Sequence, residues 1–174
     1  RSAEHLLYLI NDLLDVSKIE AGEMRLTVHP ADIYPILEDT LDSAAPLLED
    51  KPQIAFSTDI AEGLPAVPVD ARRARQIFTN LLTNAIKYTE KGEVVFSAGL
   101  SPDGSALQVQ VRDTGIGIPP EEQSSVFEAF ERSQRVRQLA IEGTGLGLAI
   151  TRFLVEAQGV DVLAPRTRVE ATCC

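Results

Sequence analysis

The stretch QIFTNLLTNAIKYT, residues 76–89, decides how the chain is interpreted, because it places two asparagines inside an otherwise apolar helical pattern. Asparagine is disfavoured inside helices, since its amide competes with the backbone for hydrogen bonds. On a helical period of about 3.6 residues, the apolar side chains gather on one side of the helix. The other side, which we predict to be an exposed polar face, carries Arg73, Gln76, Asn80, Asn84 and Lys87.

This polar face has two interpretations, an ordinary solvated surface or a ligand-binding surface. Solvated helix faces usually carry Glu, Lys and Arg, whereas Asn80 and Asn84 place two carboxamides one turn apart. A carboxamide oxygen is a neutral, hard ligand of the kind that Mg²⁺ prefers. Lys87, one turn further along, adds a point charge that suits phosphate. The pattern favours a binding surface over a solvated one.

Composition restricts the classes of protein to consider. The chain has 174 residues, 44% of them hydrophobic, which suits one α/β domain with an attached element. Its net charge of −10 argues against a nucleic-acid-binding surface, which needs a basic patch. No apolar run approaches the ~18 residues of a membrane span, and no signal peptide is present. Cys173 and Cys174 are adjacent, so they form no disulfide framework. We expect a cytoplasmic piece of a longer protein, without membrane contact.

The first part of the chain predicts a helix that packs in a bundle, followed by mixed elements. Residues 1–21 carry apolar side chains at heptad spacing, and Gly22 is a suitable C-cap. The stripe consists of Leu6, Leu9, Leu13 and Val16, widened by Leu7, Ile10 and Leu14. Next we predict a strand over 24–30 and a helix over 31–51, for which Asp32 is a candidate N-cap. A strand over 53–60, a rigid loop over 62–70 and a helix over 71–89 with Asp70 as its N-cap follow.

The second part predicts a β-hairpin and then helices separated by loops. The alternating segments 92–100 and 106–113 are joined by SPDG, a strong turn signal. A short helix over 119–130, a polar loop over 131–142 and an amphipathic helix after the glycines at 143–147 follow. These elements predict an α/β (α+β) two-layer sandwich, in which a mixed, largely antiparallel sheet packs against helices. One long bundle-type helix precedes it.

Two glycine-rich segments lie downstream of the asparagines. In RDTGIGIPP, Asp113 is followed by Gly115 and Gly117, which let the backbone approach a ligand while the carboxylate accepts a hydrogen bond from an amino group. In GTGLGLAI, residues 143–150, alternating glycines at a helix start expose N–H groups that suit phosphate. A P-loop is excluded because no lysine follows, and a dinucleotide fingerprint because no apolar strand precedes.

These motifs, in this order and spacing, resemble the ATP-binding catalytic domain of bacterial sensor histidine kinases. That domain belongs to a superfamily shared with DNA gyrase, mismatch-repair and heat-shock chaperone ATPases. QIFTNLLTNAIKYT resembles the N box of the family, DTGIG its first glycine box, FEAF its F box, and GTGLGL its second glycine box. Residues 5–22 resemble the second helix of the dimerisation domain. The resemblance covers residues 1 to about 158.

The resemblance implies roles for the matching residues. Asn84 would ligate Mg²⁺, and Asn80 stands where other ATPases of the superfamily place a catalytic glutamate. Asp113 would accept a hydrogen bond from the adenine amino group. Arg132 matches a lid arginine that approaches the γ-phosphate in some members, so Asn80 and Arg132 are the predicted catalytic residues. The loop between Pro119 and Glu142 would be a lid that closes over the nucleotide.

The predicted ATP site extends around these residues. Lys87 and Tyr88 would line the nucleotide, and Gly143, Gly145 and Gly147 would wrap its phosphates. The full predicted set is Asn80, Asn84, Lys87, Tyr88, Asp113, Gly115, Gly117, Ile118, Phe130, Gly143, Thr144, Gly145, Leu146 and Gly147.

Two features depart from the family pattern. The only histidines are His5 and His29, and neither stands in the acceptor signature of a first dimerisation helix, so we predict no phosphoacceptor in the chain. The segment VDVLAPRTRVEATCC lacks the expected glycine turn, and a frameshifted or truncated end that costs the closing strands would leave an open sheet edge. The predicted division is a dimerisation remnant at 1–22, the catalytic domain at 23–158 and a diverged tail at 159–174.

The predicted function is that of a protein-histidine kinase fragment that binds ATP and Mg²⁺. Its γ-phosphoryl acceptor would be a histidine outside this chain, so the fragment alone is expected to be inactive. The expected partners are ATP, a response-regulator receiver domain and a second copy of the full-length parent. Two alternatives stay open. One is a degenerate partner-binding module of the same fold, and the other is a free-standing ATPase, which would carry a glutamate where Asn80 stands.

Overall fold

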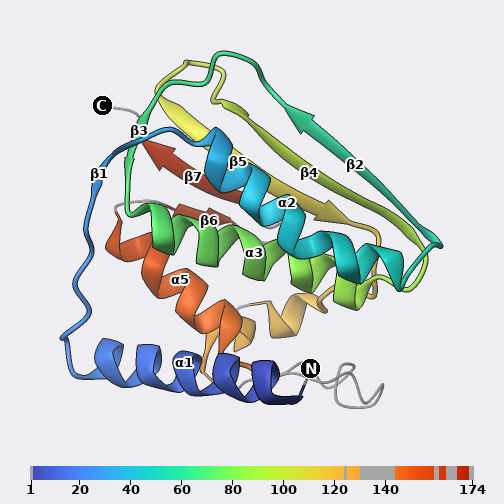
Figure 1. Ribbon diagram of the computed structural model, residues 1–174, viewed down its shortest axis with the longest axis horizontal. Coiled ribbons are helices and arrows are strands. Elements are labelled where there is room, and N and C mark those ends of the chain that lie inside the picture. The colour runs from blue at the N-terminus through green and yellow to red at the C-terminus, as the bar shows by residue number, and fades with distance from the viewer. Residues whose placement is uncertain (1, 124, 130–143, 159–160, 164–167, 173–174) are drawn as a thin grey trace.

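In the computed structural model, residues 2–123, 125–129, 144–158, 161–163 and 168–172 are described. They form a five-stranded sheet that packs with one face on a layer of helices, which confirms the predicted fold class (Figure 1). In spatial order the sheet contains β2 (Ile54–Ile60), β4 (Gly92–Leu100), β5 (Ala106–Asp113), β7 (Arg168–Thr172) and β6 (Asp161–Leu163). The helices are α1 (Ser2–Glu20), α2 (Tyr34–Glu49), α3 (Ala71–Tyr88) and α5 (Gly147–Ala157).

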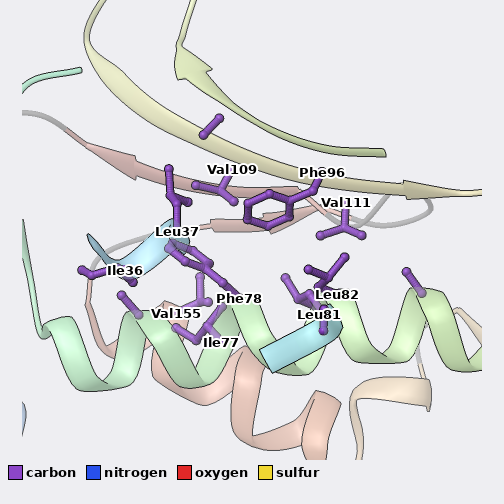
Figure 2. Packing of buried hydrophobic residues seen from close by; sticks show 14 of the residues in the cluster. Ile36, Leu37, Ile77, Phe78, Leu81, Leu82, Phe96, Val109, Val111 and Val155 are labelled. Carbon is purple, nitrogen blue, oxygen red and sulfur yellow. The ribbon is translucent and has the colours of Figure 1, made fainter. Parts of the chain in front are cut away.

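The core lies between the sheet and helix α3. β4 and β5 pair antiparallel as predicted, while β2 pairs parallel with β4. Alternate residues of the hairpin, such as Phe96 and Val109, point toward the helices and are fully buried (Figure 2). Phe78 and Leu82 meet them from the apolar side of α3. The helical period therefore identified the buried side of this helix correctly.

Helix α3 begins where the sequence predicts. Asp70 is its N-cap, and Oδ1 of Asp70 accepts a hydrogen bond of 3.1 Å from the backbone N–H of Arg73. The other carboxylate oxygen of Asp70 accepts a bond of 2.9 Å from the N–H of Thr27. One side chain therefore both starts the helix and fixes the segment that leads from α1 into the domain.

Several predicted elements between the helices were wrong. Residues 23–28 are not a strand, and the β1 strand (His29–Ala31) instead pairs antiparallel with β3 (Val67–Val69), which lies inside the predicted loop. Pro30 faces Pro68 in this ladder, and prolines there donate no hydrogen bond, so the pair stays short. Helix α2 starts after Ile33 instead of Asp32, whose Oδ1 accepts from the N–H of Tyr34.

The remaining corrections concern the lid segment and the tail. The helix predicted over 119–130 is replaced by two 3-10 turns, η1 (Pro120–Glu122) and η2 (Ser125–Phe127). The tail, for which we hypothesised a frameshifted or truncated end, supplies β6 and β7. β7 pairs antiparallel with β5, so the open edge that a loss of strands would leave on β5 is absent.

Helix α1 lies against α5, on the side away from the sheet (Figure 1). Its contact with the domain includes buried polar groups: Asp12 and Asp15 are buried, and Asp15 forms an ion pair of 2.6 Å with Arg73 of α3. Of its apolar stripe, Val16 packs against the core, whereas Leu7, Ile10, Leu13 and Leu14 are exposed. Among the described residues, no helix combines the length and apolar character that a membrane crossing requires.

Asp12 is expected to make the docking of α1 depend on pH. Burial, with the nearby charge of Asp15, raises the pKa of Asp12 from 3.8 to about 6. The folded state therefore favours the protonated form, and its contribution to stability is present below pH ~4 and is lost as the pH rises through about 6. Asp12→Asn should raise the free energy of unfolding at pH 8 by up to about 2 kcal/mol.

The measurement is urea unfolding of wild type and Asp12→Asn across the pH range. The gain from the substitution should shrink toward zero by pH ~4, because asparagine mimics the protonated carboxyl. Burial of Asp15 would raise its pKa, but its hydrogen bonds to Arg73 and Gln76 outweigh burial and lower it. The stability that Asp15 contributes is therefore present near neutral pH and is lost as the pH falls. A gain of equal size at both ends of the range would contradict the assignment to Asp12.

Candidate active site

Asn80 is buried, which corrects the prediction of an exposed polar face along the whole of α3. It is 8% exposed, and its Nδ2 donates a hydrogen bond of 2.8 Å to Oγ1 of Thr151 on α5. A methyl group at Gly147, the first residue of α5, would overlap Oδ1 of Asn80. Glycine at this position therefore lets the start of α5 lie directly over the first asparagine.

Asn84 lies one turn further along α3 and is half-buried. Its Nδ2 donates to Oδ1 of Asn80 at 3.3 Å, so both ends of the Asn80 amide have partners. A carboxamide places its nitrogen and oxygen on opposite sides, and the nitrogen of Asn84 faces Asn80. The oxygen of Asn84 consequently points away from Asn80, and no hydrogen bond to it occurs within the described part of the chain. Thr151, Asn80 and Asn84 thus form an ordered polar chain.

The C-terminal turn of α3 meets the first glycine segment. The backbone N–H of Ile116 donates to the carbonyl of Tyr88 at 3.1 Å. A methyl group at Gly115 would overlap that same carbonyl oxygen, so only glycine permits this approach. Lys87 lies with its Nζ 5.4 Å from the centroid of the Tyr88 ring, which is a cation–π distance.

Asp113 is exposed at the end of β5, beside this contact. Its Oδ1 accepts a hydrogen bond of 2.9 Å from the N–H of Gly115, which fixes the carboxylate at the start of the turn. Within the described residues, no partner is found for Oδ2. Gly117 follows with φ of 66°, and Ile118 next to it is 38% exposed. The loop therefore presents one carboxylate oxygen and one exposed apolar side chain.

The second glycine segment leads into α5. Oγ1 of Thr144 accepts from the N–H of Leu146 at 3.2 Å, and Leu146 itself is 2% exposed and anchors the turn. Gly145 lies between them with φ of 74°. No side chain caps the start of α5, so the first backbone N–H groups of the helix have no such partner there. Uncapped N–H groups at a helix start favour an anion.

The structure brings together most of the predicted site. Asn80, Asn84, Lys87 and Tyr88 share α3. Gly115 and Gly147, one from each glycine segment, lie against this helix. Gly143, Phe130 and Arg132 lie outside the described residues, as does most of the predicted lid, so their roles stay predictions. No cluster of three His, Cys, Asp or Glu side chains that could hold a metal occurs among the described residues.

Sequence reasoning missed Thr151. Its hydroxyl is buried, 2% of the residue being exposed, and it holds the amide of Asn80. The available signal was its position one turn after Gly147, which places both residues on the face of α5 that meets α3. The sequence does not show that this face of α5 covers Asn80, so the spacing of Gly147 and Thr151 did not indicate a role for Thr151.

Comparisons with known proteins agree with this geometry. The family model described as histidine kinase-, DNA gyrase B-, and HSP90-like ATPase matches residues 69–173. Sensor protein GacS of Pseudomonas syringae pv. syringae is 38% identical over 93% of the chain. Signal transduction histidine-protein kinase BarA of Escherichia coli K12 is 40% identical over the same share. The chain spans 18% of the length of each of these relatives.

Solved structures of similar fold are also sensor kinases. Full-length ShkA, in a crystal structure in complex with AMPPNP, matches 99% of this chain with a TM-score of 0.79 and 33% identity, and the match covers 37% of the ShkA chain. The mycobacterial sensor histidine kinase MprB matches 83% of this chain with a TM-score of 0.64 and 28% identity, over 97% of its own chain. The chain therefore belongs to the histidine kinase-, DNA gyrase B- and HSP90-like ATPase family, and within it to the ATP-binding catalytic domains of sensor histidine kinases.

Proposed function

We propose that this domain binds ATP together with Mg²⁺ and presents the γ-phosphoryl group to a histidine that lies outside the chain. The observation that carries the proposal is the orientation of Asn84. Its nitrogen donates to Oδ1 of Asn80 at 3.3 Å, so its oxygen is left to accept from, or ligate, another group. That amide is a suitable hard ligand, so the residues present fit Mg²⁺.

The nucleotide base is assigned to the loop after β5. Oδ2 of Asp113, which has no partner among the described residues, is suited to an exocyclic amino group, because the other oxygen already accepts from Gly115. Tyr88 and Ile118 would supply apolar contacts to the ring, and Gly117 would let the backbone come close. Lys87 adds a positive charge on the same turn of α3 as Tyr88.

The phosphates are assigned to the start of α5. Thr144, Gly145, Leu146 and Gly147, with Gly143 before them, would direct backbone N–H groups at the phosphate oxygens. Bound Mg²⁺ would neutralise charge on the transferring group, as in phosphoryl transfer generally. Asn80 is buried with both amide ends engaged, and we assign it to hold Asn84 in place. Phe130 and Arg132 are proposed as lid residues.

The division of the chain is likewise a proposal. Residues 1–22 would be the second helix of a dimerisation domain, and the exposed apolar stripe of α1 supports this, because such a stripe suits a partner helix. Residues 23–158 would be the catalytic domain, with 159–174 completing its sheet. The longer parent would act as a cytoplasmic homodimer and pass phosphate to the aspartate of a response-regulator receiver domain.

The test is binding of ATP to the whole chain with and without Mg²⁺. Wild type should bind at least about tenfold more tightly with Mg²⁺, a difference of about 1.4 kcal/mol. Asn84→Ala should bind equally well in both conditions. The control is Asn11→Ala, since Asn11 is an exposed asparagine of α1. Full Mg²⁺ dependence in Asn84→Ala would contradict the assignment, and wild type without ATP binding would favour the degenerate module.

A further inference from the structure

Lys51 follows helix α2 in the chain and reaches the end of helix α3. Its Nζ donates three hydrogen bonds of 2.8 Å, to the backbone carbonyls of Ile86, Lys87 and Thr89. The last carbonyls of a helix have no partner within the helix, and they form the negative end of its dipole. An ammonium from another element therefore caps α3, and all three of its protons are used.

The carbonyl between these acceptors has a different partner. Tyr88 O accepts from the N–H of Ile116, at 3.1 Å, and lies against Gly115 of the loop after β5. Among the carbonyls of residues 86–89, Lys51 therefore binds three, and the loop binds the fourth. The lysine and the glycine loop hold the same turn through different carbonyls, so a shift of the turn would disturb both sets of bonds.

This turn carries two of the residues assigned to the nucleotide. Lys87 and Tyr88 belong to it, and Asp113 is tied to the loop through Gly115. The Tyr88 carbonyl therefore joins this turn to the loop that follows Asp113, while Asp113 itself pairs with Val94 of β4. Burial lowers the pKa of Lys51, an effect that the charge of Glu90 opposes. The charge is held close to the helix end by its three bonds to the carbonyls.

We propose that Lys51 is a positioning residue for nucleotide binding, which keeps the last turn of α3 in register with the loop at 113–117. The proposal rests on the proposed function, since it concerns the same nucleotide site. A lysine that merely stabilised the fold would lower the free energy of unfolding and leave the affinity of the folded protein unchanged. Positioning predicts a loss of affinity in protein that is fully folded.

The test compares two variants that each remove one cap of α3. Lys51→Met removes the ammonium at the C-terminal end, and Asp70→Ala removes the N-cap at the opposite end, where Asp70 binds the N–H of Arg73. Both should lower stability in urea. Only Lys51→Met should raise the dissociation constant for ATP, by at least tenfold, while that of Asp70→Ala stays within twofold of wild type. Amide exchange of Ile116 should accelerate only in Lys51→Met.

Lys51→Gln keeps a donor group at the helix end, and it provides a second measurement of ATP affinity if Lys51→Met does not fold. It should bind ATP with a dissociation constant between those of wild type and the expected Lys51→Met value. Unchanged affinity in the folded Lys51 variants, with normal binding by wild type, would overturn the role of Lys51 alone. Equal losses in Asp70→Ala would show a general stability effect and overturn it as well. Absence of ATP binding by wild type would overturn the proposed function and this role together.

Discussion

Replacing Asp113 by alanine is expected to raise the dissociation constant for ATP at least about 100-fold, a loss of about 2.8 kcal/mol in binding free energy. The substitution removes the proposed acceptor for the adenine amino group, and hydrogen bonds to a charged group are among the stronger ones. It also removes the acceptor for the N–H of Gly115, at 2.9 Å, so the loop loses its anchor. The two losses affect the same site.

Isothermal titration with ATP measures this effect, and Asp103→Ala is its matched control. Asp103 lies in the turn at the other end of β5, where its Oδ1 accepts from the N–H of Ser105 at 3.1 Å. Its carboxylate therefore makes the same kind of turn contact as Asp113, and yet it lies at the far end of the strand. Its removal should leave the affinity unchanged. Equal affinity of Asp113→Ala and wild type would show that the base binds elsewhere.

The second large effect concerns the ion pair between α1 and α3. Arg73→Met is expected to lower the free energy of unfolding by about 3 kcal/mol, because it leaves the Asp15 carboxylate buried without its cation. The side chains of Arg73 and Asp15 are 5% and 13% exposed, and two bonds of 2.6 and 3.0 Å join them. Among the described residues, Gln76 would remain as the side-chain donor to Asp15, at 3.0 Å.

Urea unfolding at pH 7 tests this prediction, with Arg75→Met as the control. Arg75 pairs with Asp39 at 3.0 Å, but both side chains are about half exposed, so its loss should change stability by less than about 1 kcal/mol. Adding Asp15→Asn to Arg73→Met should restore part of the loss, because the unpaired charge is then removed. Equal effects of the two arginine substitutions would mean that the contact between α1 and α3 is solvated.

Local patterns in the sequence were sufficient for the central elements. Helix α3 and the β4–β5 hairpin have strong periods, a good cap at Asp70 and a clear turn, so the sequence predicts each of them almost to the residue. The short ladder of β1 and β3 could not be predicted, because its strands have no comparable local pattern. Its strands contain Pro30 and Pro68 and have only three residues each, so their pairing depends on where α2 and α3 bring them.

The sequence predicts the candidate site as a set of residues but not as an arrangement. A helical period shows that Asn80 and Asn84 share a face, yet it does not show what covers that face. Helix α5 covers Asn80, and Thr151 supplies the bond that a solvated asparagine would make to water. Lys51 gave no signal either, because nothing in its neighbourhood along the chain indicates that it caps a helix that begins 20 residues later.

The absence of the family's glycine turn from the tail does not show that the tail lacks strands. Residues 160–174 lack the glycine turn of the family, but Arg168–Thr172 still alternates and pairs with β5. Strand pairing uses backbone groups, which every residue except proline supplies in full. A diverged sequence can therefore keep its place in a sheet as long as alternate side chains suit the two faces.

The position of β7 has a consequence for synthesis on the ribosome. β7 lies between β5 and β6 in the sheet, although it is made after every other described element. Helix α3, the hairpin and both glycine segments are synthesised first, and one edge of β5 stays unpaired until residues 168–172 follow. An unpaired strand edge is a template for pairing with other chains. Nascent chains halted before residue 168 would therefore be the form most prone to aggregate, and chaperones would be needed most at that stage.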